Sequence, residues 1–116
     1  MTIDDQPVVL DVETIVVCTG GGGLLAGIAV AVKAVRPDVR IVGVQAAGAA
    51  AYPGSLAVHH PVALASMSTM ADGIAVGRPG DVPFALIDEL VDQVVVVDDE
   101  TIARALVLTL ERGKLV

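Results

Sequence analysis

The sequence predicts an α/β fold built on a parallel sheet, and three observations carry this prediction. Apolar residues make up 54% of the 116 residues and aromatic residues only 2%, so we expect a core of Val, Ile, Leu and Ala, the usual filling of a parallel sheet covered by helices. Three short runs rich in Val and Ile are apolar on both faces, as buried parallel strands are. Segments with helical spacing alternate with these runs, which is typical of layered α/β domains.

The first two elements flank a run of glycines. A buried strand is predicted over residues 13–19, which are β-branched and apolar on both faces. Four glycines follow at 20–23. A helix is predicted over 24–35, where apolar residues recur at helical spacing, and Pro37 stops it. Lys33 falls in its last turn, where a cation suits the helix dipole.

The middle of the chain is less regular. A second strand is predicted over residues 40–45. Residues 46–68 are rich in Ala, Gly and Pro and have no obvious period, so we expect loops and short helical pieces there. Residues 70–76 then lead into a turn-rich stretch at 77–80.

Regular elements return in the C-terminal third. Asp81 is predicted to cap a helix, and a third strand is predicted over residues 93–97. Either Asp98 or Asp99 is then expected to cap a last helix that ends at Gly113. The apolar side of this helix is formed by Ile102, Leu106 and Leu110.

Composition and charge exclude several classes of protein. The net charge is −7 and no cluster of Lys or Arg occurs, which argues against nucleic acid as a partner. The single cysteine, Cys18, rules out an internal disulfide, and no Cys/His spacing suits zinc. The long uncharged stretches 15–32 and 41–71 are interrupted by Gly or Pro, so no membrane span is expected. Because residues 1–6 are acidic rather than basic, no secretory signal is predicted, and we expect a soluble, cytoplasmic protein.

The glycine run is the most informative motif. Glycine permits backbone angles that a side chain forbids, and it lets amide N–H groups approach a ligand closely. The helix that follows adds unpaired N–H groups and the positive end of its dipole. A run of glycines in a tight strand-to-helix junction therefore favours an anion site, above all for phosphate, over a plain turn.

The sequence also limits which phosphate compound this loop binds. Gly21, Gly23 and Ala26 satisfy the G-x-G-x-x-A form of the dinucleotide fingerprint. That fingerprint needs an acidic residue at the end of the next strand, where this chain has Gln45. NAD is therefore disfavoured, although a dinucleotide-binding half-domain stays open as an alternative. The Walker pattern is absent, because no Lys-Ser or Lys-Thr follows the glycines.

At this point several motifs carry a family resemblance. The stretch GGGGLLAGIA at 20–29 resembles the tetraglycine loop of fold-type II pyridoxal-phosphate (PLP) enzymes. Further stretches agree in order, and they are VGVQ at 42–45, ADGIAV at 71–76, DDETIAR at 98–104 and LERGKLV at 110–116. Together they most resemble the threonine and serine dehydratases (ammonia-lyases) and the related serine racemases. The resemblance spans about residues 12–116 and leaves residues 1–11 as a non-family segment.

The resemblance implies a cofactor, a reaction and a set of site residues. It implies part of the parallel-sheet, Rossmann-like large domain of such an enzyme, with pyridoxal 5'-phosphate as cofactor. In the family the glycine loop wraps the cofactor phosphate and a later glycine lies near the ring. These roles fall on Gly20, Gly21, Gly22, Gly23, Leu24 and Gly73. The family reaction converts threonine to 2-oxobutyrate and ammonia, or serine to pyruvate.

The chain departs from the family pattern at the catalytic centre. The Schiff-base lysine of the family precedes the glycine loop, and nothing here corresponds to it. The only lysines are Lys33 and Lys114, which are expected to be ordinary surface residues. The resemblance therefore implies no catalytic residue in this chain. Gln45 and Ala51 stand where some members carry acidic ligands for a cation, so no metal site is expected.

These departures leave several readings of the function. We expect a fragment that is inactive alone and that forms a homo-oligomer or associates with a missing catalytic half. A non-enzymatic PLP- or phosphate-binding module is one alternative, and a fragment of a serine racemase-type enzyme is another. A sheet separated from its neighbours is also expected to expose apolar surface and to leave one face bare.

Cysteine and histidine are two further residue types with functional potential in this chain. Cys18 is expected to be a buried small apolar residue rather than a reactive thiol. His59 and His60 are neighbours in an irregular stretch and are expected to be solvated loop residues.

Overall fold

A three-stranded parallel sheet forms the centre of the computed structural model, which describes residues 2–3, 6–7 and 11–113. The strand order is β3-β4-β5, and all neighbours are parallel. The strands are β3 (Thr14–Cys18), β4 (Arg40–Ala46) and β5 (Gln93–Val97). A separate antiparallel pair joins β1 (Thr2–Ile3) to β2 (Gln6–Pro7). The predicted α/β fold with a parallel sheet is confirmed.

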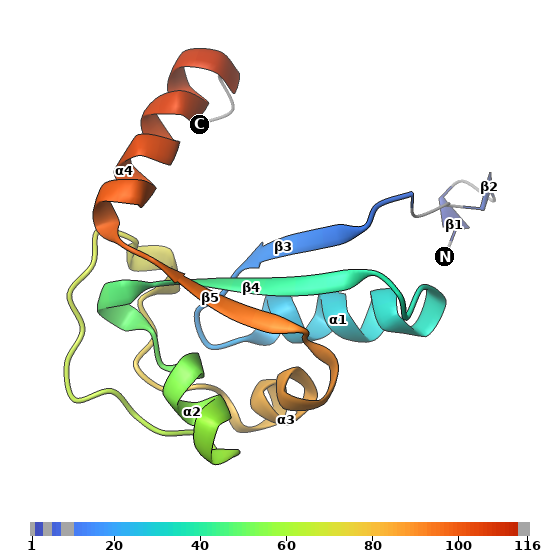
Figure 1. Ribbon diagram of the computed structural model, residues 1–116, viewed down its shortest axis with the longest axis horizontal. Coiled ribbons are helices and arrows are strands. Elements are labelled where there is room, and N and C mark those ends of the chain that lie inside the picture. Colours follow the sequence, from blue (N-terminus) through green and yellow to red (C-terminus); the bar gives the residue numbers. More distant parts are fainter. Residues whose placement is uncertain (1, 4–5, 8–10, 114–116) are drawn as a thin grey trace.

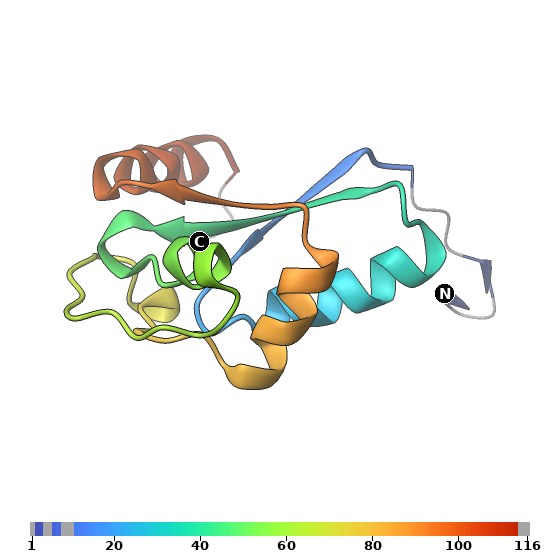
Figure 2. The ribbon, with the colours of Figure 1, turned by 60° about the horizontal axis from the view of Figure 1, so that its bottom comes forward.

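Helices pack mainly against one face of this sheet (Figure 1). Figure 2 shows α1, α2 and α3 together on that side, whereas α4 lies on the other side at the end of the sheet. The helices are α1 (Gly23–Val35), α2 (Tyr52–Val58), α3 (Asp81–Leu90) and α4 (Asp99–Leu108), with 3-10 turns η1 (Ala47–Ala49) and η2 (Asp72–Ile74) and a π-helical turn η3 (Thr109–Gly113). Within the described ranges, no helix is long and apolar enough to cross a membrane.

The core lies between the sheet and helices α1 and α3. Leu25, Ile41 and Ile87 meet there and are almost completely buried, and burying a side chain of this size stabilises a fold by about 1.5–3 kcal/mol. The two aromatic residues of the chain, Tyr52 and Phe84, are also buried and stack with ring centroids 6.1 Å apart. The core is therefore not purely aliphatic, contrary to the prediction from composition.

The opposite face of the sheet is largely uncovered, as predicted. Val16 in β3 is 63% exposed there, and Cys18 on the same face is exposed as well. The prediction that residues 13–19 are buried on both faces is therefore wrong for this face. The prediction of a buried Cys18 is wrong for the same reason, because α4, the helix on that side, stands at the end of the sheet and leaves Cys18 exposed.

The predicted N-cap residue is confirmed for α4 and wrong for α3. Asp98 caps α4, since its carboxylate accepts a hydrogen bond from the Thr101 N–H at 2.8 Å. Hydrogen bonding from the Thr101 side chain, and then from its N–H, lowers the pKa of Asp98. The prediction that Asp81 caps α3 is wrong, because Gly80 occupies the cap position. Asp81 is the first helical residue, and its carboxylate pairs with Arg78 at 2.8 Å instead.

Candidate functional site

The glycine loop, residues 20–23, connects the carboxyl end of β3 to the start of α1. Ligands of open parallel sheets bind beyond this edge, where the strands end. Thr19 extends the strand by one hydrogen bond, from its N–H to the Val44 carbonyl at 2.9 Å. The chain then turns at Gly22, whose φ of +107° lies in the left-handed region that favours glycine.

A cleft of about 250 Å³ opens above this loop. All six residues predicted to bind the cofactor line it, namely Gly20, Gly21, Gly22, Gly23, Leu24 and Gly73. Cys18, Thr19, Leu25, Ile74 and Val76 complete the lining. Sequence reasoning missed Ile74 and Val76, because no periodicity in their segment reveals which side chains turn toward the loop.

The backbone N–H groups of the loop are available to a ligand. Among the residues that the structure describes, none accepts a hydrogen bond from the amides of residues 20–23. The N-cap Gly22 has no side chain to satisfy them, and the first turn of α1 contains no acidic residue. Unpaired amides and the positive end of a 13-residue helix together attract an anion. These features fit the phosphate group of a cofactor.

The second wall of the cleft is the irregular segment 61–80, which carries Gly73. Hydrogen bonds to several other parts of the chain hold it at the edge of the sheet. The Ser68 N–H donates to the Gly48 carbonyl at 2.9 Å, and the Gly80 N–H donates to the Gly21 carbonyl at 3.0 Å. The Asp99 carboxylate accepts from the Thr69 hydroxyl at 2.5 Å. The start of α4 is thus bonded to the same segment as the glycine loop.

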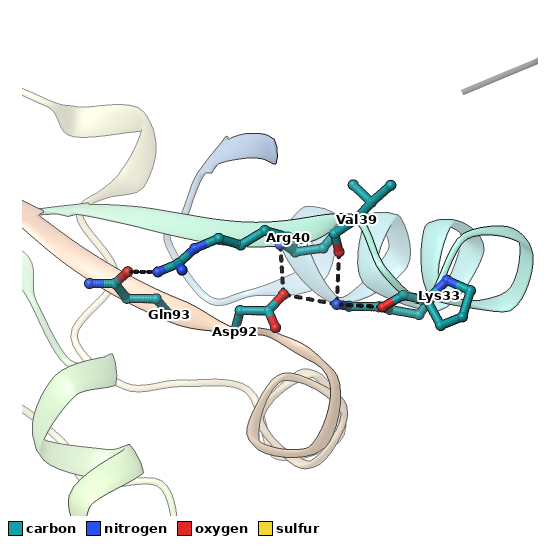
Figure 3. A network of polar contacts seen from close by, with 7 residues as sticks. Lys33, Val39, Arg40, Asp92 and Gln93 are labelled. Atoms are coloured by element: carbon teal, nitrogen blue, oxygen red, sulfur yellow. Dashed lines mark hydrogen bonds and ion pairs between the residues drawn. The ribbon is translucent and has the colours of Figure 1, made fainter. Parts of the chain in front are cut away.

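Lys33 lies far from the cleft, in the last turn of α1. It is ten residues along the helix from Gly23, which corresponds to about 15 Å. Figure 3 shows its ammonium group bonded to the Val39 carbonyl and to the Asp92 carboxylate, each at 2.8 Å. The bond from Lys33 lowers the pKa of Asp92. Lys33 therefore has a structural role at the opposite end of the sheet, and Lys114 lies outside the described residues.

The other candidate residues do not join the cleft, apart from Cys18. His59 and His60 are exposed, as predicted, and His59 ends α2 with its ring 3.3 Å from the Asp88 carboxylate. Asp88 is 29 positions from His59 in the sequence and approaches it only in the folded chain. In the part of the chain that the structure describes, no three His, Cys, Asp or Glu residues group as metal ligands do.

Comparison with known sequences places these features in a family. A family profile described as "Pyridoxal-phosphate dependent enzyme" matches residues 2–116. An L-threonine ammonia-lyase of Thermotoga maritima is 42% identical over 114 residues, covering 98% of this chain and 28% of that protein. An L-threonine ammonia-lyase of Geobacter sulfurreducens is 50% identical over 105 residues, covering 90% of this chain and 26% of that protein. The chain thus spans less than a third of each of these relatives. The boundary expected at residue 12 stays a prediction.

Solved structures give the same picture. A maize serine racemase superposes with a TM-score of 0.87 and 37% identity, covering 90% of this chain and 33% of that one. The processed form of threonine deaminase isoform 2 from Solanum lycopersicum superposes with a TM-score of 0.88 and 36% identity, covering 93% of this chain and 32% of that one.

Proposed function

The chain belongs to the family of pyridoxal-phosphate-dependent enzymes, and we propose that it supplies the cofactor-phosphate site of a threonine/serine dehydratase. One observation carries the proposal. Residues 20–23 line a cleft, and no described residue accepts a hydrogen bond from their amides. In this proposal Gly20, Gly21, Gly22, Gly23 and Leu24 hold the phosphate of pyridoxal 5'-phosphate, and the Gly73 backbone lies beside its ring.

The cofactor and this chain contribute differently to the reaction. When bound, pyridoxal phosphate acts as an electron sink for the substrate carbon that loses its proton. The chain contributes binding and orientation, through amide donors and the α1 dipole. Among the residues that the structure describes, no lysine, histidine or carboxylate lines the cleft, and Lys33 is bonded to Asp92 at the far end of the sheet. We therefore expect no turnover of threonine or serine by the chain alone.

The complete enzyme in this proposal includes protein surface that covers the bare side of the sheet. Val16 and Cys18 are exposed on that side, and Leu106 and Leu110 are exposed on α4 and η3. Exposed apolar surface of this kind is typical of contacts with other protein segments. The partner proposed is the catalytic half of a dehydratase or a second copy of the chain. An exposed free thiol fits a reducing compartment, so the proposed location is the cytoplasm.

The position of Cys18 provides a direct test of the site. Cys18 is the only cysteine of the chain and lines the same cleft as the glycine loop. We expect saturating pyridoxine 5'-phosphate, which has no aldehyde to react with lysines, to slow alkylation of Cys18 by iodoacetamide about fivefold or more, because a bound phosphate ester excludes the reagent. The alkylation rate is followed by mass spectrometry.

Pyridoxine without the phosphate is the matched control ligand and is expected to give little protection. Equal protection by both ligands, or by neither, would contradict a phosphate site at the loop.

The same preparation separates the functional alternatives. We expect the isolated chain to bind the phosphate ester but to release no 2-oxo acid from threonine. The alternative of a non-enzymatic binding module gains support if no added dehydratase segment restores turnover. Formation of D-serine rather than pyruvate in a restored enzyme favours the racemase alternative, which the superposition on maize serine racemase motivates.

A further inference from the structure

Two buried polar side chains lie directly beneath the glycine loop. Gln45 in β4 and Tyr52 at the start of α2 are both 0% exposed. The Gln45 amide nitrogen donates to the carbonyl oxygens of Thr19 and Gly20, each at 3.4 Å, and its oxygen accepts from the Tyr52 N–H at 2.9 Å. The Tyr52 hydroxyl donates to the Gly21 carbonyl at 2.8 Å. Because buried polar groups are costly unless they are bonded, these contacts hold the loop to the interior.

Each backbone carbonyl from residue 19 to residue 22 accepts a hydrogen bond. Besides the contacts of Gln45 and Tyr52, the Gly22 carbonyl accepts from the Ala26 N–H at 2.8 Å. In a planar trans peptide, the carbonyl of one residue and the N–H of the next point in opposite directions. Holding the carbonyls of residues 19–22 in these bonds therefore fixes the N–H groups of residues 20–23 in the opposite directions. The residues that carry these N–H groups line the cleft.

We propose that Gln45 and Tyr52 are positioning residues that hold the glycine loop in its phosphate-binding conformation before the ligand arrives. This inference rests on the proposed phosphate site and assigns the residues that prepare it. Glycine loses more backbone conformational entropy on ordering than any other residue. Hydrogen bonds that order a run of glycines before the ligand arrives therefore remove a large part of the entropy cost of binding. Donors that are already aimed at the anion need no reorganisation when it binds.

The two residues contribute unequally to this restraint. The bond from Tyr52 to Gly21 is short at 2.8 Å, whereas those from Gln45 to the loop are 3.4 Å long and weaker. Burial raises the pKa of Tyr52 to about 12, so its hydroxyl keeps the proton that it donates. Gln45 acts partly through Tyr52, whose backbone it fixes. Its position requires both a donor and an acceptor, which an amide supplies and a carboxylate does not.

The first test compares Tyr52→Phe with the wild-type chain. Phenylalanine keeps the ring that stacks on Phe84 and loses only the hydroxyl, so the fold is expected to persist. We expect the affinity for pyridoxine 5'-phosphate in calorimetric titration to fall roughly tenfold, as one lost hydrogen bond implies. We also expect shifted amide NMR signals for residues 20–23 without ligand. Val32→Ala truncates a buried α1 side chain away from the cleft, and this control should change neither readout.

Gln45→Glu gives a second readout that a purely structural role does not produce. A carboxylate at this position repels the carbonyls of Thr19 and Gly20, whereas a protonated carboxyl donates to one of them. The affinity of this variant, relative to wild type at the same pH, is therefore expected to fall as the pH rises. A constant ratio across the pH range contradicts the role assigned to Gln45.

The outcomes distinguish this inference from the proposed function. If the wild-type chain binds the ester and Tyr52→Phe binds it equally well with unchanged loop signals, the positioning role is overturned. If the wild-type chain does not bind the ester, the proposed function fails. In that case the NMR spectra without ligand still test the positioning role. Unchanged signals of residues 20–23 in Tyr52→Phe reject this role, and shifted signals support it.

Discussion

Gly22→Ala is expected to lower the free energy of unfolding by about 3 kcal/mol and to abolish phosphate binding. Alanine is strained at the φ of +107° that this residue adopts, which costs about 1–2 kcal/mol. An added Cβ would also lie 2.0 Å from the Tyr52 hydroxyl oxygen and 2.8 Å from the Ile87 side chain. Both neighbours are buried in the core, so relieving the overlap costs a further 1–3 kcal/mol, roughly. Urea denaturation and calorimetric titration with pyridoxine 5'-phosphate measure the two effects.

Gly27→Ala is the matched control for this substitution. Gly27 lies inside α1, and an added Cβ would meet nothing within 4 Å. Alanine is favoured over glycine in a helix by about 1 kcal/mol, so this variant should be more stable than wild type and should bind the ester normally. A stable, ester-binding Gly22→Ala chain would show that the loop does not have the conformation described above.

Gly48→Ala is expected to lower the stability and the ester affinity of the chain nearly as much, because it displaces the second wall of the cleft. A Cβ at Gly48 would lie 1.7 Å from the Ser68 carbonyl oxygen, and the Ser68 N–H also donates to the Gly48 carbonyl at 2.9 Å. Two backbone segments thus approach too closely for any side chain. We expect a loss of about 2–3 kcal/mol in the free energy of unfolding, together with weaker ester binding because the segment that carries Gly73 is displaced.

Gly54→Ala provides the comparison in this region. Gly54 lies in α2, where an added Cβ would meet nothing within 4 Å, so its denaturation midpoint should equal or exceed that of wild type. Amide hydrogen exchange of residues 68–76 locates the damage in Gly48→Ala. Unchanged exchange there, together with full stability, would contradict the close approach of these two segments.

The regular elements were predictable because their signals are local. The strand at 93–97 was predicted with the bounds that it has in the structure, and the helix at 24–35 begins only one residue earlier, at Gly23. The hydrophobic pattern and turn residues that define such elements lie within the elements themselves. The glycine loop and Gly73 were found from motifs, and the structure brings them to one cleft.

The features that the sequence did not reveal depend on contacts between distant segments. Tyr52 packs beneath a loop 31 positions away in the sequence, and no periodic pattern around it indicates that packing. Cys18 has apolar neighbours along the chain, but its exposure depends on which elements cover the sheet. Asp81 has a typical capping sequence, yet its carboxylate pairs with Arg78. Tertiary contacts of this kind override local preference.

The most direct test of the central claim is an amide-correlation NMR titration of the full chain with pyridoxine 5'-phosphate, which carries the cofactor's phosphate and has no aldehyde to react with lysines. The phosphate is expected to accept hydrogen bonds from the N–H groups of residues 20–23. The account predicts a dispersed spectrum in which these four glycine signals move saturably, whereas signals of the Lys33 and Asp92 region stay in place. Glycine signals that remain unmoved at saturating ligand, in an otherwise folded spectrum, would contradict the assignment of this loop as the phosphate site.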